Sequence, residues 1–174
     1  MKSLLILGAG GFGQMIKETA LALGYEKVVF LDDAAKSDDV IGMCCDYVLR
    51  HSEYPVAVAA FGNNKTRLFW TDKLIAEGYE VPAIVHPSAI VSPSAVLEAG
   101  CFVMQRAVVN THTRVERAAL INSGAVVDHD SVVCAGAHIG LGSVVKANCT
   151  IEAGQKVEAG EVIFSTRRKI EGVD

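Results

Sequence analysis

The chain has 174 residues, of which 51% are hydrophobic, and a formal net charge of −4. This length accommodates one or two domains with a sizeable core, and the negative charge argues against a nucleic-acid backbone as the partner. There is no run of eighteen apolar residues, so we expect no transmembrane helix and no membrane partner. The short apolar segment after Met1 and Lys2 leads straight into glycines, which indicates a strand rather than a signal peptide.

The first part of the chain predicts a strand, a glycine turn, a helix and a second strand. Ser3–Leu7 is an apolar strand that runs into Gly8–Gly13, with the sequence GAGGFG. Gln14–Leu23 has the apolar spacing of a helix, and Lys27–Leu31 is the second strand. This order is typical of a Rossmann-like nucleotide-binding fingerprint, because glycines let a backbone approach a diphosphate at a helix N-terminus.

Two acidic residues complete that fingerprint. Asp32 and Asp33 follow the second strand, where a carboxylate can accept hydrogen bonds from a ribose or a base. An ordinary tight turn between strand and helix is the plain alternative. A complete NAD domain needs about twice this length. One nucleotide half-site therefore fits better, and an NAD oxidoreductase is disfavoured.

The segment up to residue 82 completes a small α/β domain. Asp33–Asp39 is polar and predicts a loop, Pro55–Phe61 a strand, Lys65–Glu77 a helix, and Glu80–Ile84 a last strand that leads directly into the next part.

Gly62, Asn63 and Asn64 lie between the strand and the helix of this segment. If the sheet is parallel, these residues meet the glycine turn at the edge where ligands bind. Helix capping by the two asparagines is the alternative.

From Ala83 onward the sequence repeats every six residues. Fourteen aliphatic residues recur without a break: Val85, Val91, Leu97, Val103, Val109, Val115, Ile121, Val127, Val133, Ile139, Val145, Ile151, Val157 and Ile163. A small residue precedes each by two positions, except at Gln155 and Glu161. This period fits neither a helix nor one long strand, and it predicts a hexapeptide-repeat β-solenoid with three faces and about eighteen residues per coil. A β-sandwich is the disfavoured alternative.

The solenoid also carries candidate catalytic histidines. Residues eighteen apart should stack, so Asp130 should lie over His112. His129 is flanked by Asp128 and Asp130, and neighbouring carboxylates raise the pKa of an imidazole and make its free nitrogen a better base. His138 follows half a coil later, so it should reach His129 only across a subunit interface. Taken singly, each histidine could also be an ordinary corner residue on a solvent-exposed edge of the solenoid.

The five cysteines form no CxxC pair and no spacing suited to zinc. Cys101 and Cys149 occupy small-residue positions of the repeat, which indicates a packing role. A reducing compartment follows, and we expect a cytoplasmic protein.

Several motifs together resemble the sialic acid O-acetyltransferase and UDP-4-amino-sugar N-acetyltransferase family, whose bacillosamine-type members acetylate an amine or hydroxyl of a nucleotide-linked or acidic sugar. The resemblance covers nearly the whole chain and rests on GAGGFG, FLDD, FGNN, HPSAIVSPSAVLEAG, NSGAVVDHDSVV and the following His138.

The resemblance implies a fold, a co-substrate and site residues. The fold is an α/β Rossmann-like nucleotide-binding domain (residues 1–82) followed by a left-handed parallel β-helix (residues 83–166). The charged tail after it (residues 167–174) is read from the sequence itself and departs from the family. His129 matches the general base and Asp130 its supporting acid. His138 and Ala159 match contacts to the co-substrate acetyl-CoA, no metal takes part, and the protein is a homotrimer. The sugar-nucleotide site matches Gly10, Gly11, Phe12, Gly13, Asp32, Asp33, Gly62 and Asn63.

Two departures from the family leave alternatives open. Phe12 stands where some amino-sugar members have a histidine, and the repeats stop near Ile163, about one coil earlier than usual. A sugar-nucleotide-binding homologue that has lost transfer because of its shortened solenoid is therefore the main alternative. A metal enzyme of the solenoid carbonic anhydrase kind would need three converging histidines, which the spacing does not suggest. The sequence does not name the sugar or choose between amine and hydroxyl.

Overall fold

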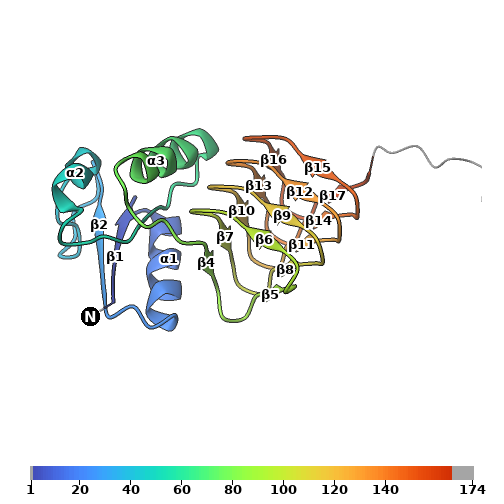
Figure 1. Cartoon of the computed structure of the whole chain (residues 1–174), viewed down its shortest axis with the longest axis horizontal. Coiled ribbons are helices and arrows are strands. Elements are labelled where there is room, and N and C mark those ends of the chain that lie inside the picture. The colour runs from blue at the N-terminus through green and yellow to red at the C-terminus, as the bar shows by residue number, and fades with distance from the viewer. Residues whose placement is uncertain (1, 166–174) are drawn as a thin grey trace, which may run out of the picture.

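The computed structural model describes residues 2–165, which form an α/β region and a parallel β-solenoid lying end to end (Figure 1). The expected charged tail, residues 167–174, and Thr166 lie outside the described residues.

The α/β region is built on a three-stranded parallel sheet with the order β2-β1-β3. Strands β1 (Ser3–Leu7) and β2 (Lys27–Leu31) have the bounds that the sequence predicts, and β3 (Ala57–Ala59) is shorter than predicted. Helices α1 (Gly11–Ala22) and α3 (Asn64–Ala76) begin at the carboxyl ends of β1 and β3. Three strands make a short α/β region, smaller than a complete Rossmann domain.

One predicted element of this region was wrong, and two observed elements had not been predicted. The expected strand Glu80–Ile84 is absent, because only Glu80 bridges Val56, and Pro82 lacks the N–H that a strand at this point would donate. The segment before β3 also folds into a 3₁₀ turn, η1 (Cys44–Asp46), and a short helix, α2 (Tyr47–Arg50), neither of which has a readable apolar period.

The solenoid confirms the predicted period of six residues at every repeat. Its two-residue strands are β4 (Ile84–Val85), β5 (Ile90–Val91), β6 (Val96–Leu97), β7 (Phe102–Val103), β8 (Val108–Val109), β9 (Arg114–Val115), β10 (Leu120–Ile121), β11 (Val126–Val127), β12 (Val132–Val133), β13 (His138–Ile139), β14 (Val144–Val145), β15 (Thr150–Ile151), β16 (Lys156–Val157) and β17 (Val162–Ile163). The second residue of each strand points inward, and from Val103 to Val157 these side chains are almost completely buried.

Three parallel sheets form the faces of the solenoid. The sheet with the order β16-β13-β10-β7-β4 is called the covered sheet, because the α/β region packs on it. The sheet with the order β17-β14-β11-β8-β5 is called the valine sheet, after the valine pairs of β8, β11 and β14. The third sheet has the order β15-β12-β9-β6. Paired residues are eighteen apart, as in Leu120 with His138, which confirms the predicted stacking. Several corners require left-handed backbone, and the non-glycine residues there are Arg106, His112, Ala118, Asp130 and Asn148.

The covered sheet takes its name from the α/β region that packs on it. Its outward side chains Ile84, Phe102 and Leu120 are buried in one core with β1, β2 and β3. Phe12 of α1 packs edge-to-face on Phe102, with the ring centroids 5.2 Å apart. Helices α1 and α3 lie on the side of the α/β region that faces the solenoid (Figure 1).

Arg67 of α3 links the α/β region to the solenoid at the contact between them, which we call the junction. Its side chain is completely buried, and its guanidinium donates to the carbonyl oxygens of Ala118 (2.7 Å), Gly136 (2.9 Å) and Phe61 (3.0 Å). It also donates to the side-chain oxygen of Asn64, and burial lowers its pKa to about 10. Ala118 and Gly136 are left-handed corners of successive coils, so one side chain binds two coils to the α/β region.

Candidate active site

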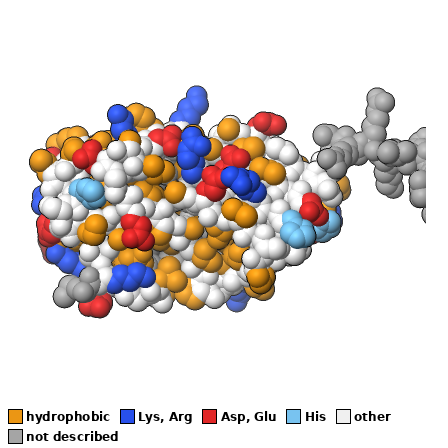
Figure 2. All heavy atoms as spheres, viewed as in Figure 1, with side chains coloured by type: hydrophobic (Ala, Val, Ile, Leu, Met, Phe, Trp, Pro, Cys, Tyr) orange, Lys and Arg blue, Asp and Glu red, His pale blue; other side chains and the backbone are white. Residues whose placement is uncertain are grey.

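His129 and Asp130 lie at the corner between the valine sheet and the third sheet. Nδ1 of His129 is 2.7 Å from Oδ2 of Asp130, and both side chains are about half exposed. A proton on Nδ1 donates to the carboxylate and leaves Nε2 as the basic nitrogen. No other described residue hydrogen-bonds Nε2, so it is available to a substrate. Histidine side chains lie beside an acidic side chain on the solenoid surface in Figure 2.

The surrounding carboxylates make His129 a stronger base. The hydrogen bond with Asp130 raises the pKa of His129 above its ordinary value, desolvation opposes this, and the charges of Asp128 and Asp130 add to the rise. Asp128 accepts from the His129 backbone N–H at 2.8 Å and from the Asn110 amide at 3.1 Å, and these bonds lower the pKa of Asp128. The corner therefore favours a histidine that takes up a proton.

His112 joins this group from the coil below. Its Nδ1 is 3.4 Å from Oδ1 of Asp130, the carboxylate oxygen that does not contact His129. The predicted placement of Asp130 over His112 is confirmed.

His138 has the opposite environment. It extends from the covered sheet, and its Nε2 is 3.1 Å from the amide nitrogen of Asn122. The Asn122 oxygen accepts the backbone N–H of Ser123 at 2.8 Å, so the Asn122 amide N–H points at His138. Nε2 is then an acceptor and the proton lies on Nδ1. Burial first, and then the charges of Arg67 and Lys156, lower the pKa of His138 to about 4.

The structure does not bring His129 and His138 together within one chain. His138 is on the covered sheet, whereas His129 is at the corner between the other two sheets. His138 instead lines a hollow of about 610 Å³ between the solenoid and the start of α3, together with Gly62, Asn63, Asn64, Lys65, Gly154 and Lys156. Gly62 and Asn63, two predicted substrate residues, thus lie beside His138.

The glycine turn leaves open backbone at the start of α1. A Cβ added at Gly10 or Gly11 would meet nothing within 4 Å. A Cβ added at Gly13 would lie 2.0 Å from the carbonyl oxygen of Gly8. Gly13 is therefore needed for helix–strand packing, while Gly10 and Gly11 leave room for a ligand near the free N–H groups of the helix.

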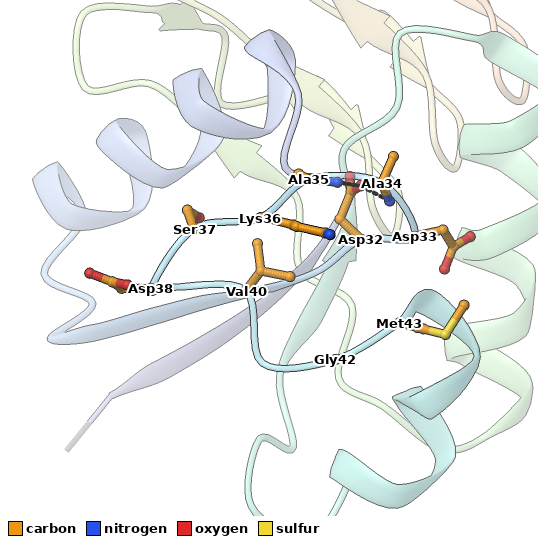
Figure 3. Close-up of a pocket in the computed structure, with 10 residues that line it drawn as sticks. All are labelled: Asp32, Asp33, Ala34, Ala35, Lys36, Ser37, Asp38, Val40, Gly42 and Met43. Carbon is orange, nitrogen blue, oxygen red and sulfur yellow. Dashed lines mark hydrogen bonds between the residues drawn. The ribbon is translucent and has the colours of Figure 1, made fainter.

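Asp32 and Asp33 shape the loop that follows β2. Asp32 accepts the backbone N–H groups of Ala9 (2.7 Å), Ala34 (2.8 Å) and Ala35 (2.7 Å), and its carboxylate turns back toward its own loop in Figure 3. Partial burial acts to raise the pKa of Asp32, but these bonds outweigh it and lower the pKa. Asp33 accepts the N–H of Cys44 at 2.8 Å. The loop borders a hollow of about 570 Å³ lined by residues 32–38, 40, 42 and 43.

The remaining predicted site residues lie apart from His129. Phe12 packs in the junction against Phe102. Asn63 caps α3 by accepting the N–H of Thr66 at 3.0 Å, which is the capping role left open in the sequence. Ala159 is exposed at the corner between β16 and β17. The sequence did not predict the roles of Asn122 and Arg67. Asn122 contacts His138, 16 positions further along the chain, and Arg67 contacts solenoid residues 51 to 70 positions away. No short sequence motif includes residues so far apart.

Within residues 2–165, no three His, Cys, Asp or Glu side chains form a group that could hold a metal ion. None of the helices there is long and apolar enough to cross a membrane.

Comparisons with known proteins agree with this arrangement. The family described as PglD N-terminal domain matches residues 3–74. PerB from Caulobacter crescentus, solved with CoA and GDP-perosamine, is 28% identical with a TM-score of 0.84, and the alignment covers 94% of this chain and 89% of PerB. The acetyltransferase domain of PglB from Neisseria gonorrhoeae is 32% identical with a TM-score of 0.72, covering 94% of this chain and 92% of that domain.

The PglB domain has also been solved with acetyl coenzyme A; that structure is 31% identical with a TM-score of 0.70, covering 93% of this chain and 92% of its own. The identity to the PglB domain exceeds 30% over more than 90% of this chain and of that domain. Together with the solenoid and the pair His129 and Asp130, this identity shows the family. The chain belongs to the family of hexapeptide-repeat sugar acetyltransferases that includes PglB and PerB.

Proposed function

We propose that the protein transfers an acetyl group from acetyl-CoA to an amino group of a nucleotide-linked sugar. The observation that carries this proposal is His129, whose Nδ1 is held by Asp130 at 2.7 Å and whose side chain is half exposed. The amine acceptor is supported by PerB, a perosamine N-acetyltransferase solved with CoA and GDP-perosamine. The PglB complex with acetyl coenzyme A supports the donor.

His129 acts as general base in a direct transfer. The sugar amine attacks the thioester carbonyl carbon, the new C–N bond forms, and His129 Nε2 takes the proton that the amine loses. Asp130 stabilises the imidazolium that results. When the tetrahedral intermediate collapses, the C–S bond breaks and the proton on Nε2 passes to the departing thiolate. Activity should therefore rise with pH as His129 loses its proton, above the ordinary histidine range.

Residues 1–82 act as a Rossmann-like half-site for the nucleotide, and residues 83–166 as the transferase unit. The open backbone at Gly10 and Gly11 suits a diphosphate at the N-terminus of α1. The loop after β2, with Asp32 and Asp33, suits the ribose and base at the carboxyl edge of the sheet. The sugar then extends toward the hollow that His138 and Asn63 line.

A complete site needs two copies of the chain. His129 lies at the corner opposite the covered sheet, on which the α/β region packs, so the base and the nucleotide half-site of one chain face different directions. The valine sheet carries an unbroken outward column of aliphatic residues: Ile90, Val108, Val126, Val144 and Val162. Ile90 is 66% exposed and Val162 41% exposed. Such a column suits an interface between identical subunits in a closed ring, here a homotrimer.

The test is acetyl-CoA turnover with a panel of GDP- and UDP-linked amino sugars and their hydroxyl counterparts. In His129→Ala we expect kcat to fall by roughly 10² to 10⁴, with little change in KM, because the base acts in the transition state. The control is His86→Ala, which removes a histidine at the entry of the solenoid. Unchanged turnover in His129→Ala would remove the assigned base, and a wild-type protein without saturable acetyl-CoA binding by calorimetry would favour the non-catalytic binding protein.

A further inference from the structure

Two histidines share one carboxylate at the catalytic corner. Oδ2 of Asp130 contacts Nδ1 of His129 at 2.7 Å, and Oδ1 of Asp130 lies 3.4 Å from Nδ1 of His112. His112 stands eighteen residues before Asp130, so the register of the solenoid places it directly below. The His112 backbone is held in turn, because its N–H donates to the Ser94 hydroxyl at 3.1 Å, one coil further down.

Asp130 needs a second contact to stay in place. Its side chain is 49% exposed at a left-handed corner with φ +54°, where packing restrains it little. A carboxylate bound through one oxygen can turn about its χ2 bond, which has a broad torsional preference. A contact at the other oxygen fixes the plane of the group, and with it the direction of the bond to His129.

We propose that His112 is a positioning residue for the acetyl transfer: it holds the far oxygen of Asp130 so that the near oxygen stays on Nδ1 of His129. This inference rests on the proposed function. His112 contacts neither reacting group, and it acts only through Asp130.

The other charged groups at this corner do not replace His112. Asp128 binds the His129 backbone N–H and the Asn110 amide, not Asp130. Lys146 on the coil above lowers the pKa of Asp128 as the smallest of several causes. Among the residues that the structure describes, His129 and His112 are the side chains that pair with Asp130.

Three variants test the role of His112. His112→Ala removes the donor, while His112→Asn places an amide nitrogen where Nδ1 stood and suits a left-handed corner, as Asn148 does one coil above Asp130. Arg106→Ala is the matched control, since Arg106 has the same φ of 57° and its N–H likewise donates to a serine hydroxyl, Ser88. We expect kcat to fall roughly three- to tenfold in His112→Ala, with KM unchanged, and to recover in His112→Asn.

The decisive readouts are the titration of the His129 ring followed by NMR and a double-mutant cycle. We expect His112→Ala to lower the pKa of His129 toward its ordinary value, because the bond with Asp130 loosens, and to have no further effect on kcat in an Asp130→Ala background. A raised or unchanged His129 pKa, or an equal loss of kcat in that background, would overturn the proposal. Because the titration needs no substrate, it decides the matter even if the wild-type protein transfers no acetyl group.

Discussion

His129 and His138 are the same side chain in two opposite settings. Hydrogen bonding with Asp130 raises the pKa of His129, whereas burial together with Arg67 and Lys156 lowers the pKa of His138 to about 4. At neutral pH His138 is uncharged, and Asn122 keeps its proton on Nδ1. In the proposed reaction His129 exchanges a proton, whereas His138 keeps its proton on Nδ1 at neutral pH.

The depressed pKa of His138 makes the stability of the protein depend on pH. Between the unfolded value near 6.5 and the folded value of about 4, the unfolded chain binds more protons, so stability falls as the pH falls through this window. In His138→Gln, whose amide oxygen can still accept from Asn122, we expect the loss between pH 7 and pH 4.5 to be smaller by about 1 to 2 kcal/mol. Urea unfolding at the two pH values measures this, and parallel losses in both proteins would contradict it.

At the residue scale, the sequence predicts contacts that follow the repeat and misses those that cross between the two parts. Asp130 over His112 follows from the spacing of eighteen, and Asp130 beside His129 from adjacency. The amide of Asn122 against His138 depends on the exact approach of two coils. In the sequence Arg67 resembles an ordinary surface residue of a helix, and only the packing of α3 on the solenoid shows that it is completely buried.

The turn between β1 and α1 contains glycines of two kinds. Gly10→Ala has open space and an ordinary φ of −67°, so we expect a normal stability but a higher KM for the nucleotide sugar, since the methyl group intrudes where the diphosphate would approach. Gly13→Ala would press against the Gly8 carbonyl and should destabilise the fold by about 1 to 3 kcal/mol. Thermal unfolding and substrate kinetics on both variants separate the two roles, and a normal KM in Gly10→Ala would argue against a diphosphate at this turn.

Arg67 makes the buried polar contacts between helix α3 and the solenoid. In Arg67→Met we expect a loss of roughly 2 to 4 kcal/mol, because the buried carbonyls of Ala118 and Gly136 lose their donors. The control is Arg117→Met in the same junction, whose exposed ion pair with Asp72 should contribute under about 1 kcal/mol. Chemical unfolding gives both values, and equal effects of the two substitutions would show that the buried guanidinium has no special role.

At the element scale, strong local patterns were readable and weak ones were not. The strands β1 and β2 follow from continuous apolar runs between turn signals, and all fourteen solenoid strands follow from one period. The η1 turn and α2 are too short to show a period, and the expected strand at Glu80–Ile84 reads as apolar but includes Pro82. The outward column Ile84, Phe102 and Leu120 is the signal that could have shown which face is covered.

In the whole molecule, His129 and the α/β region lie on different sides of the solenoid, so under the proposed function assembly and activity should be lost together. In Val126→Lys, a charge at the centre of the valine sheet should prevent trimer formation and abolish turnover while the chain stays folded. Light scattering, circular dichroism and the transfer assay measure the three properties. The control is Val96→Lys on the third sheet, an outward valine that is 48% exposed. An active monomer would show that a single chain holds a complete site.

Each coil of the solenoid takes eighteen residues and each face takes six, so the number of residues in a segment determines how far around the solenoid axis the segment runs. Deleting the eighteen residues of one coil beyond the junction shifts all later coils along the solenoid axis by one coil and keeps each side chain on its own face. Deleting six residues instead turns the remaining coils by a third of a revolution. A six-residue deletion between Gly136 and Gly154 would move Lys156 off the covered sheet, whereas the same deletion before His129 would carry the base to a different corner. Tolerance to insertions and deletions in this protein should therefore follow a rule of eighteen, with the junction at Arg67 as the fixed point from which the coils are counted.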